Sequence, residues 1–328
     1  MFVLALFWNI VLLLLGFAAL IKGADFFVDG SSALARTFRV PSVIIGLTIV
    51  AFGTSAPELA VSTSAAVSGA NEIALSNVTG SNIFNLLMVL GVCAVIRPIP
   101  IERGILKRDF PFSIAVAVAI LLAVSLPMLT GGVTLPVPMS QNVGEISRWL
   151  GIVLLAVFVA YVVLLVFFAR RNKTEESDEP PVPVWKSLLL IAVGIACIIV
   201  GGQLVVNNAV DIAAFFGMSQ TLIGLTVVAL GTSLPELVTS IVASRKGENG
   251  LAVGNVVGSN LFNMLLILGA SAAIHPITVN FASVIDLGIM IAVSVITLLF
   301  CLTKHISRVE GAVMVLLYAA TMVFAVVR

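Results

Sequence analysis

The sequence predicts an all-α integral membrane protein whose ten transmembrane helices form two five-helix repeats of inverted topology. Two observations predict this fold. The 328-residue chain is 60% hydrophobic and only 10% charged, whereas about 25% of the residues of a soluble domain are charged. In addition, two long segments of the chain repeat one another almost residue for residue. So large an apolar surface requires lipid as its solvent, so the lipid bilayer is the first predicted partner.

Ten apolar stretches are long enough to cross a bilayer, which takes roughly 20 apolar residues. The first stretch lacks a basic n-region and a cleavage site, so it is interpreted as a retained helix and not a signal peptide. We expect the first and sixth helices to continue in amphipathic form past Asp25 and Gln203, with Asp25 and Asp29 as interfacial caps. The predicted helices cover residues 2–22, 41–68, 72–96, 110–127, 149–169, 186–206, 219–244, 249–273, 282–302 and 309–327.

The basic residues predict the orientation. Fifteen of the 17 lysines and arginines fall in alternate loops, and only Arg148 and Arg328 lie on the other side. The positive-inside rule makes the first set cytoplasmic. We therefore expect a multi-pass protein of the plasma (inner) membrane with both termini extracytoplasmic. The net charge of +1 gives no reason to expect a nucleic-acid partner, and no required protein partner is evident.

The internal repeat is visible as two pairs of matching segments. VIIGLTIVAFGTSAPELAVS at 43–62 matches TLIGLTVVALGTSLPELVTS at 221–240, and NVTGSNIFNLLMVLG at 77–91 matches NVVGSNLFNMLLILG at 255–269, all at one offset of 178 residues. This predicts a first repeat over 1–169 with its motif at 43–91, a cytoplasmic linker over 170–185, and a second repeat over 186–328 with its motif at 221–269. Because five helices are an odd number, the second repeat enters from the opposite face, a design common in secondary transporters.

Glu58 and Glu236 are the chemically informative residues, because each lies near the middle of a long apolar span. A charge at that depth costs about 2.5–3.5 kcal/mol on insertion scales, and no lysine or arginine lies at matching depth. A bound cation would remove this cost, as would protonation. The alternative is a pair of neutral carboxyls hydrogen-bonded within the bundle, but their duplication inside matched motifs favours a cation site.

Pro57 and Pro235 directly precede these glutamates. Proline lacks an N–H and clashes with the carbonyl four residues earlier, so each helix is expected to kink or open. Carbonyls around 51–54 and 229–232 would then be freed, which is tolerated at mid-membrane where they line a cavity. A kink that serves packing alone is the alternative. The fold class therefore includes broken helices around a midplane ion site.

The GSNIFN and GSNLFN segments supply a second set of oxygens. Ser81 and Asn85 are four residues apart and share a helix face, as do Ser259 and Asn263, and the four are expected to line the facing wall of one cavity. Small polar runs that only join helices are the alternative. Ca2+ accepts 6–8 oxygen ligands in irregular geometry, and two glutamates balance one Ca2+, two Na+ or two H+. No nucleophile or metal triad accompanies them, so we expect neither an enzyme nor a cofactor.

The paired motifs GTSAPE…GSNIFN and GTSLPE…GSNLFN resemble those of the calcium/cation antiporter superfamily, in particular the bacterial sodium/calcium exchanger group. The resemblance implies a secondary active antiporter that exchanges Na+ for Ca2+ by alternating access, with these ions as its substrates. The implied ligands are Glu58, Thr54, Glu236 and Thr232 for Ca2+, and Ala51, Ser55, Ser81, Ala229, Ser233 and Ser259 for Na+, with Asn85 and Asn263 lining the cavity.

Two other functions stay open. Proton/calcium exchangers of the superfamily typically carry a GNxxE-type motif, so GTSxPE favours Na+, but H+/Ca2+ antiport on the same fold is the alternative. A passive cation channel is the alternative from another class. Some relatives, including K+-dependent exchangers, have Asp where this chain has Asn263, and the amide therefore argues against K+ dependence.

Overall fold

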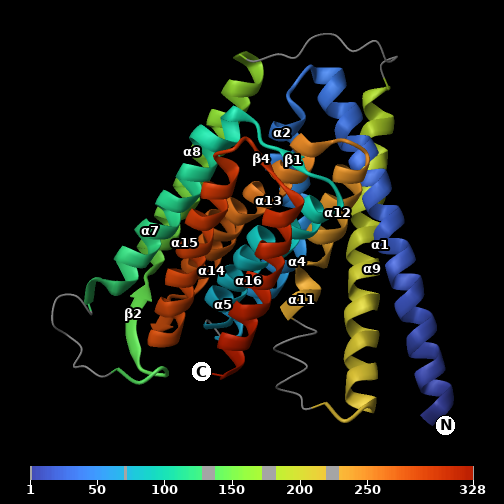
Figure 1. Cartoon of the computed structure of the whole chain (residues 1–328). Coiled ribbons are helices and arrows are strands. Elements are labelled where there is room, and N and C mark those ends of the chain that lie inside the picture. Colours follow the sequence, from blue (N-terminus) through green and yellow to red (C-terminus); the bar gives the residue numbers. More distant parts are fainter. Residues whose placement is uncertain (1, 70–71, 128–136, 172–181, 219–228, 328) are drawn as a thin grey trace.

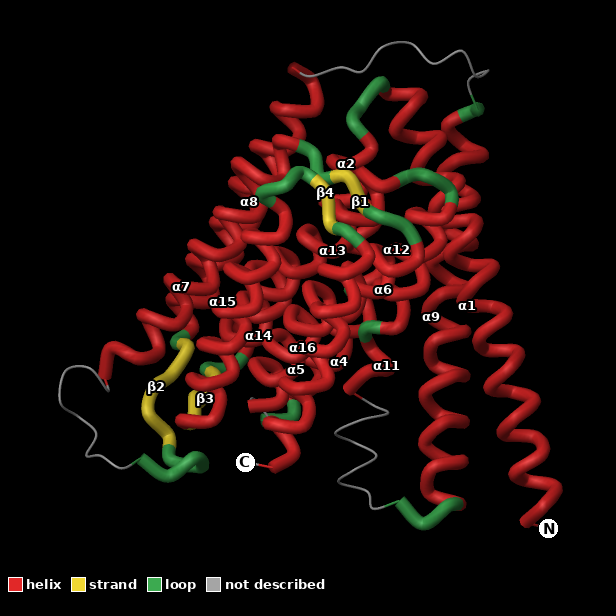
Figure 2. The backbone as a smooth tube through the Cα atoms, in the orientation of Figure 1, coloured by secondary structure: helices red, strands yellow, loops and turns green. Residues whose placement is uncertain are grey.

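The computed structural model describes residues 2–69, 72–127, 137–171, 182–218 and 229–327, and long helices make up most of it (Figures 1 and 2). Within these ranges, eight helices are long and apolar enough to cross a membrane, and one further pair of helices forms a span bent by 50°. The chain is therefore a multi-pass helical membrane protein.

The elements follow in chain order. Those of the first half are α1 (Phe2–Phe38), α2 (Ser42–Ile45), η1 (Gly46–Val50), α3 (Ala51–Thr54), α4 (Ala56–Val67), α5 (Glu72–Phe84), η2 (Asn85–Val89), α6 (Leu90–Ile96), β1 (Ile99–Pro100), η3 (Ile105–Asp109), α7 (Phe110–Pro127), β2 (Asn142–Ile146) and α8 (Arg148–Arg171). Those of the second half are α9 (Val184–Phe215), α11 (Ala229–Thr232), α12 (Leu234–Arg245), α13 (Asn249–Leu261), η6 (Phe262–Ile267), α14 (Leu268–Ile274), β3 (Ile277–Asn280), α15 (Phe281–Cys301), β4 (His305–Ile306) and α16 (Arg308–Val327). Elements written η are π-helical turns.

Most predicted helices lie where the apolar pattern puts them. The seventh, over 219–244, lies partly outside the described residues, and its described part forms α11 and α12. As expected, α1 and α9 continue well past Asp25 and Gln203. The prediction that Asp25 and Asp29 cap the first helix is wrong, because α1 runs through both. They pair instead with Lys246 at the end of α12, whose Nζ lies 2.7 Å from Asp29 Oδ1.

Helices α1 and α9 form a close antiparallel pair along one side of the molecule (Figure 1). A Cβ built on Gly16 would lie 2.9 Å from the Leu204 Cβ, and one built on Gly23 would lie 2.8 Å from the Cys197 Cβ. The contacts move backwards along α9 as they move forwards along α1, which makes the pair antiparallel. Glycine allows this approach because small residues let helix backbones come together in a membrane.

The last helix of each half packs against the other half. A Cβ on Gly151 of α8 would lie 2.7 Å from the Gly269 carbonyl oxygen of α14, and one on Gly91 of α6 would lie 2.9 Å from the Gly311 carbonyl oxygen of α16. Gly91 and Gly269 occupy equivalent places in the repeated segments. The two halves are therefore interlocked through matching contacts and are not separate domains side by side.

Two short strand pairs, which the sequence did not predict, form a further contact between the halves. Strand β1 pairs antiparallel with β4, and β2 pairs antiparallel with β3. Each pair joins one strand of the first half to one of the second. The β1–β4 pair and the ends of α8 and α9 that flank the linker lie at one end of the molecule, whereas β2 and both termini lie at the other (Figure 1).

Burial separates the centre of the bundle from its lipid-facing rim. The most apolar window of the span Asn249–Ile274 is 94% buried and that of Glu72–Ile96 is 72% buried, whereas the corresponding windows of α8 and α16 are 22% and 11% buried. A helix that is apolar all round and little buried faces lipid. The central spans are those that carry the GSNIFN and GSNLFN segments.

Candidate ion-binding site

Both GTSxPE segments break their helix at the serine. Helix α3 ends at Thr54 and α4 begins at Ala56, with Ser55 between them at φ −83° and ψ 8°. The equivalent Ser233, at φ −93° and ψ 5°, separates α11 from α12. The prolines that follow explain the breaks, because they lack the N–H that would continue the helical hydrogen bonds. The predicted kinks are confirmed in both repeats.

The break leaves the Ala51 carbonyl partly engaged. It still accepts the helical hydrogen bond of the Ser55 amide at 3.0 Å, and the Thr54 hydroxyl lies 3.4 Å from it. A carbonyl oxygen has two lone pairs, so this acceptor keeps limited capacity for a further contact. The proline therefore frees less of the backbone at Ala51 than the sequence suggested.

The break also places each glutamate in the first turn of a new helix. Glu58 lies in the first turn of α4 and Glu236 in the first turn of α12. The N–H groups of a first turn have no partner within their helix, and the helix dipole favours negative charge there. Both side chains are at most 1% exposed. The local backbone thus partly compensates two carboxylates that water does not reach.

Each glutamate is hydrogen-bonded to the broken turn of the other repeat. The Ser55 hydroxyl donates to Glu236 Oε1 at 2.9 Å, and the Ser233 hydroxyl donates to Glu58 Oε1 at 3.0 Å. These two bonds are related by the offset of 178 residues. One site is therefore built jointly by the two repeats, and neither half makes it alone.

The serines of α5 and α13 lie on the same carboxylates. Ser81 Oγ is 3.5 Å from Glu58 Oε1, and Ser259 Oγ is 3.5 Å from Glu236 Oε1. The Ser233 hydroxyl also lies 3.0 Å from Ser81 Oγ. The two serines of the predicted facing wall thus lie next to the glutamates.

Two asparagines that the sequence reasoning did not assign to the site donate hydrogen bonds to α4 and α12, the helices that follow the breaks. Asn77 donates to Ser62 Oγ at 2.9 Å and lies 3.4 Å from the Glu58 carbonyl. At the equivalent place, Asn255 donates to Ser240 Oγ at 3.0 Å. Their equal positions in the two repeats are the signal that could have identified them.

In the part of the chain that the structure describes, several buried oxygens of the two motifs have no hydrogen-bond partner. They include Glu58 Oε2, Glu236 Oε2, Asn85 Oδ1, Asn263 Oδ1 and the Thr232 hydroxyl. Buried polar atoms are normally satisfied, and carboxylate and amide oxygens are ligands that hard cations accept. Over the same residues no group of three or more His, Cys, Asp or Glu side chains forms, so two charges and neutral oxygens make up the donor set.

Both amide positions of this set lie in π-helical turns. Turn η2 begins at Asn85, and η6 contains Asn263. Single π turns inside α-helices are frequent at functional sites, because the wider turn changes the direction of its side chains. Gly258 precedes η6, and a Cβ there would lie 2.8 Å from the Ala51 Cβ. The absence of a side chain at Gly258 therefore lets α13 approach the broken span.

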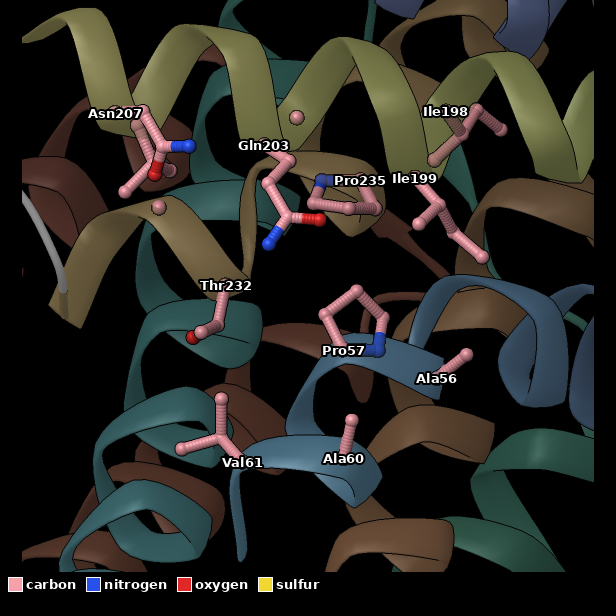
Figure 3. A pocket seen from close by; sticks show the side chains of 13 residues that line it. Ala56, Pro57, Ala60, Val61, Ile198, Ile199, Gln203, Asn207, Thr232 and Pro235 are labelled. Atoms are coloured by element: carbon pink, nitrogen blue, oxygen red, sulfur yellow. The ribbon is translucent and has the colours of Figure 1, made fainter. Parts of the chain in front are cut away.

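The remaining predicted ligands occupy the edges of the site. Thr54 is fully buried, and its hydroxyl donates to Asn255 Oδ1 at 3.0 Å. Thr232 lines a cavity of about 330 Å3 between α4, α9 and the α11–α12 break. Gln203 of α9 extends into the same space (Figure 3). Ala229 is the first residue of α11, and its side chain lies outside the described structure.

Comparison with known proteins identifies the family. The model of the sodium/calcium exchanger protein family matches residues 8–167 and 186–327. The chain belongs to the sodium/calcium exchanger family. It is 34% identical to the sodium/calcium exchanger MaX1 of Methanosarcina acetivorans over 96% of this chain and 97% of that protein. It is 36% identical to the inner membrane protein YrbG of Escherichia coli over 88% of this chain and 87% of that one.

A solved structure of the sodium–calcium exchanger NCX_Mj has the same fold. It superposes with a TM-score of 0.81 at 29% identity, over 97% of this chain and 99% of that chain. The expected family is therefore confirmed. Membership of the exchanger family makes the chain a cation/Ca2+ antiporter by class, and relatives such as MaX1 are named as exchangers and not as enzymes.

Proposed function

We propose that this protein is a secondary active antiporter that exchanges Na+ for Ca2+ across the membrane by alternating access. The observation that carries the proposal is the pair of buried glutamates, each hydrogen-bonded to the other repeat and each with one oxygen that has no hydrogen-bond partner among the described residues. The name of the similar MaX1 and the Na+ soak of the similar NCX_Mj support Na+ as the driving ion.

The charge at the site explains why transport would be coupled. Two carboxylates buried at mid-membrane cost several kcal/mol when uncompensated. One Ca2+ or two Na+ neutralise them equally. The site therefore favours conformational change when an ion is bound and opposes it when none is bound, which makes the movement of one ion type depend on the other. A passive channel has no such requirement.

The ligand assignment is part of the same proposal. Ca2+ would be held by the carboxylates of Glu58 and Glu236 and the backbone carbonyls of Thr54 and Thr232, with the amide oxygens of Asn85 and Asn263 lining the cavity. The proposed Na+ ligands are Ala51, Ser55, Ser81, Ala229, Ser233 and Ser259. The serine contacts with the glutamates support this set, because the same hydroxyls could turn to a cation at short range.

The architecture is proposed to be ten helices in two inverted repeats, 1–169 and 186–328, joined by a linker over 170–185. Three findings support it. The pair α1–α9 is antiparallel, the serine–glutamate bonds are related by one offset, and the last helix of each half packs on the other half. We further propose that the linker is cytoplasmic and both termini extracytoplasmic in the inner membrane, where the similar YrbG lies by its name.

The test is Ca2+ flux into proteoliposomes under an imposed Na+ gradient or an imposed pH gradient. We expect the Na+ gradient to drive uptake and the pH gradient to have no effect. The double variant Glu58→Gln/Glu236→Gln in matched liposomes measures the leak. Uptake driven by the pH gradient alone would establish H+/Ca2+ antiport instead, and flux without any counter-ion would establish a channel.

A further inference from the structure

Four asparagines meet at the centre of the molecule, where α5 and η2 cross α13 and η6. They are Asn82, Asn85, Asn260 and Asn263, and all are at most 2% exposed. The proposed function uses only Asn85 and Asn263. Asn82 and Asn260 lie one turn earlier in the same motifs and have no role in the proposed cation site.

Asn82 and Asn260 bind each other's backbone. The Asn82 amide nitrogen lies 3.3 Å from the Asn260 carbonyl oxygen, and the Asn260 amide nitrogen lies 3.4 Å from the Asn82 carbonyl oxygen. A backbone carbonyl can only accept a hydrogen bond. Each of these side chains must therefore turn its NH2 group towards the other backbone, which fixes the direction of its amide oxygen.

The fixed oxygens in turn orient the site amides. Asn260 Oδ1 accepts from the Asn85 amide nitrogen at 3.2 Å, and Asn82 Oδ1 accepts from the Asn263 amide nitrogen at 2.9 Å. Because an amide oxygen cannot donate, Asn85 and Asn263 must present their NH2 groups here. Their own oxygens are then turned away from this contact, and neither has a hydrogen-bond partner among the described residues.

We propose that Asn82 and Asn260 are positioning residues that set the amide orientation of Asn263 and Asn85, so that oxygen and not NH2 faces the cation. Each positioning residue acts across the repeats, Asn260 on Asn85 and Asn82 on Asn263. The inference rests on the proposed cation site. The orientation decides binding, because a reversed amide would direct a partial positive charge at the ion and remove one oxygen ligand from the set that Ca2+ needs.

A double-mutant cycle tests this inference, because coupling appears only between residues that act through one another. We expect Asn85→Ala and Asn260→Ala each to raise the KM for Ca2+ by about tenfold, the size of a lost polar contact of about 1.4 kcal/mol. The double variant should be no worse than about tenfold, because Asn260 has nothing left to orient. Maximal exchange rates should change little.

The repeat supplies the matched control. Asn82→Ala combined with Asn85→Ala should raise the KM by about 100-fold, because Asn82 orients the other amide and the two effects multiply. The mirror cycle of Asn82 with Asn263 should be coupled in the same way as that of Asn260 with Asn85. This second cycle keeps the test available if Asn260→Ala fails to fold.

Ca2+ binding is also measured apart from transport, as the rise in unfolding temperature of the purified protein on adding CaCl2. The positioning role would be overturned if the effects of Asn260→Ala and Asn85→Ala on the KM multiplied. It would also be overturned if the effects of Asn82→Ala and Asn85→Ala were coupled. Coupling as expected, with uptake driven by pH and not by Na+, would overturn the proposed driving ion and leave this inference standing. A wild-type protein that binds no Ca2+ would overturn both.

Discussion

Thr54 and Thr232 hold the same place in the two repeats but lie in different surroundings. The Thr54 hydroxyl is fully buried and hydrogen-bonded to Asn255 of the other half at 3.0 Å. The Thr232 hydroxyl has no hydrogen-bond partner among the described residues, and its residue lines the cavity beside α9. Around these two residues the serine–glutamate bonds of the two repeats are nearly identical in length, at 2.9 and 3.0 Å.

The centre of the site, where the serines bond the glutamates, is therefore symmetric between the two repeats. Its flanks, at Thr54 and Thr232, are not symmetric. The same contrast appears on the outer helix pair, where Asp25 of α1 is 3.3 Å from Lys246, while the equivalent Gln203 of α9 lines the cavity. The two repeats thus place equivalent residues on both flanks but pack them differently: Thr54 is hydrogen-bonded to the other half, and Thr232 lines a cavity.

The largest predicted effect tests the symmetric centre. Glu58→Gln and Glu236→Gln should each lower Na+-driven Ca2+ uptake by about 100-fold or more, because each leaves half the charge of a bound Ca2+ uncompensated at a cost of about 3 kcal/mol. The two losses should be equal within a few-fold. Uptake is measured in proteoliposomes, with Glu72→Gln on the exposed first turn of α5 as control. Wild-type uptake by either variant would remove that glutamate from the site.

The serines that bridge the repeats should give the next largest effect. Ser55→Ala and Ser233→Ala each remove a donor to a buried carboxylate, and a hydrogen bond to a charged group contributes about 1.5–3 kcal/mol. We expect each to change the KM for Na+ or Ca2+ by about tenfold or more. Ser64→Ala, on the exposed face of α4, is the control. A large effect in one serine and none in the other would show that the centre is not symmetric in function.

Much of this fold follows from the sequence because the bilayer permits few structures. A spanning helix must satisfy its own backbone, so apolar length predicted most of the described helices. Proline chemistry predicted that the second helix would kink or open, and it breaks at Ser55. The glutamates were identifiable because their burial is costly anywhere in lipid. The repeat offset then indicated which residues of the two halves are equivalent.

The contacts between the halves could not be predicted in the same way. Helical spacing places Ser55 within one turn of Glu58, yet its hydroxyl bonds Glu236, because the break turns it towards the other repeat. The reciprocal bonds of Asn82 and Asn260 depend likewise on where α5 crosses α13. Strands as short as β1 and β4, with two residues each, are too short to show an alternation of apolar and polar residues. The repeat offset therefore shows which residues of the two halves are equivalent, but not which residues touch one another.

The threonines test the asymmetric flanks directly. Thr54→Val should lower the free energy of unfolding by about 1 kcal/mol, because it leaves Asn255 Oδ1 without its donor. Thr232→Val should change it by no more than about 0.5 kcal/mol, since its hydroxyl has no such partner among the described residues. Both variants keep the backbone carbonyl proposed to bind Ca2+. The measurement is denaturant unfolding of the ion-free protein in detergent. Equal losses would contradict the assigned difference between the flanks.

The smallest predicted effect concerns the ion pairs that tie α1 to α12. Lys246 is 30% exposed, and its partners Asp25 and Asp29 are 30% and 55% exposed. Ion pairs so open to solvent are worth between 0 and about 1 kcal/mol and weaken with salt. Lys246→Met should therefore lower the free energy of unfolding by less than about 1 kcal/mol, and 1 M KCl should abolish the difference from wild type. Lys107→Met, which removes an exposed lysine with no ion pair in the described ranges, is the control. A loss of several kcal/mol in low salt would mean that these ion pairs hold α1, whereas the glycine contacts with α9 are expected to hold it. A loss that persists in 1 M KCl would mean that Lys246 acts through something other than a solvent-exposed ion pair.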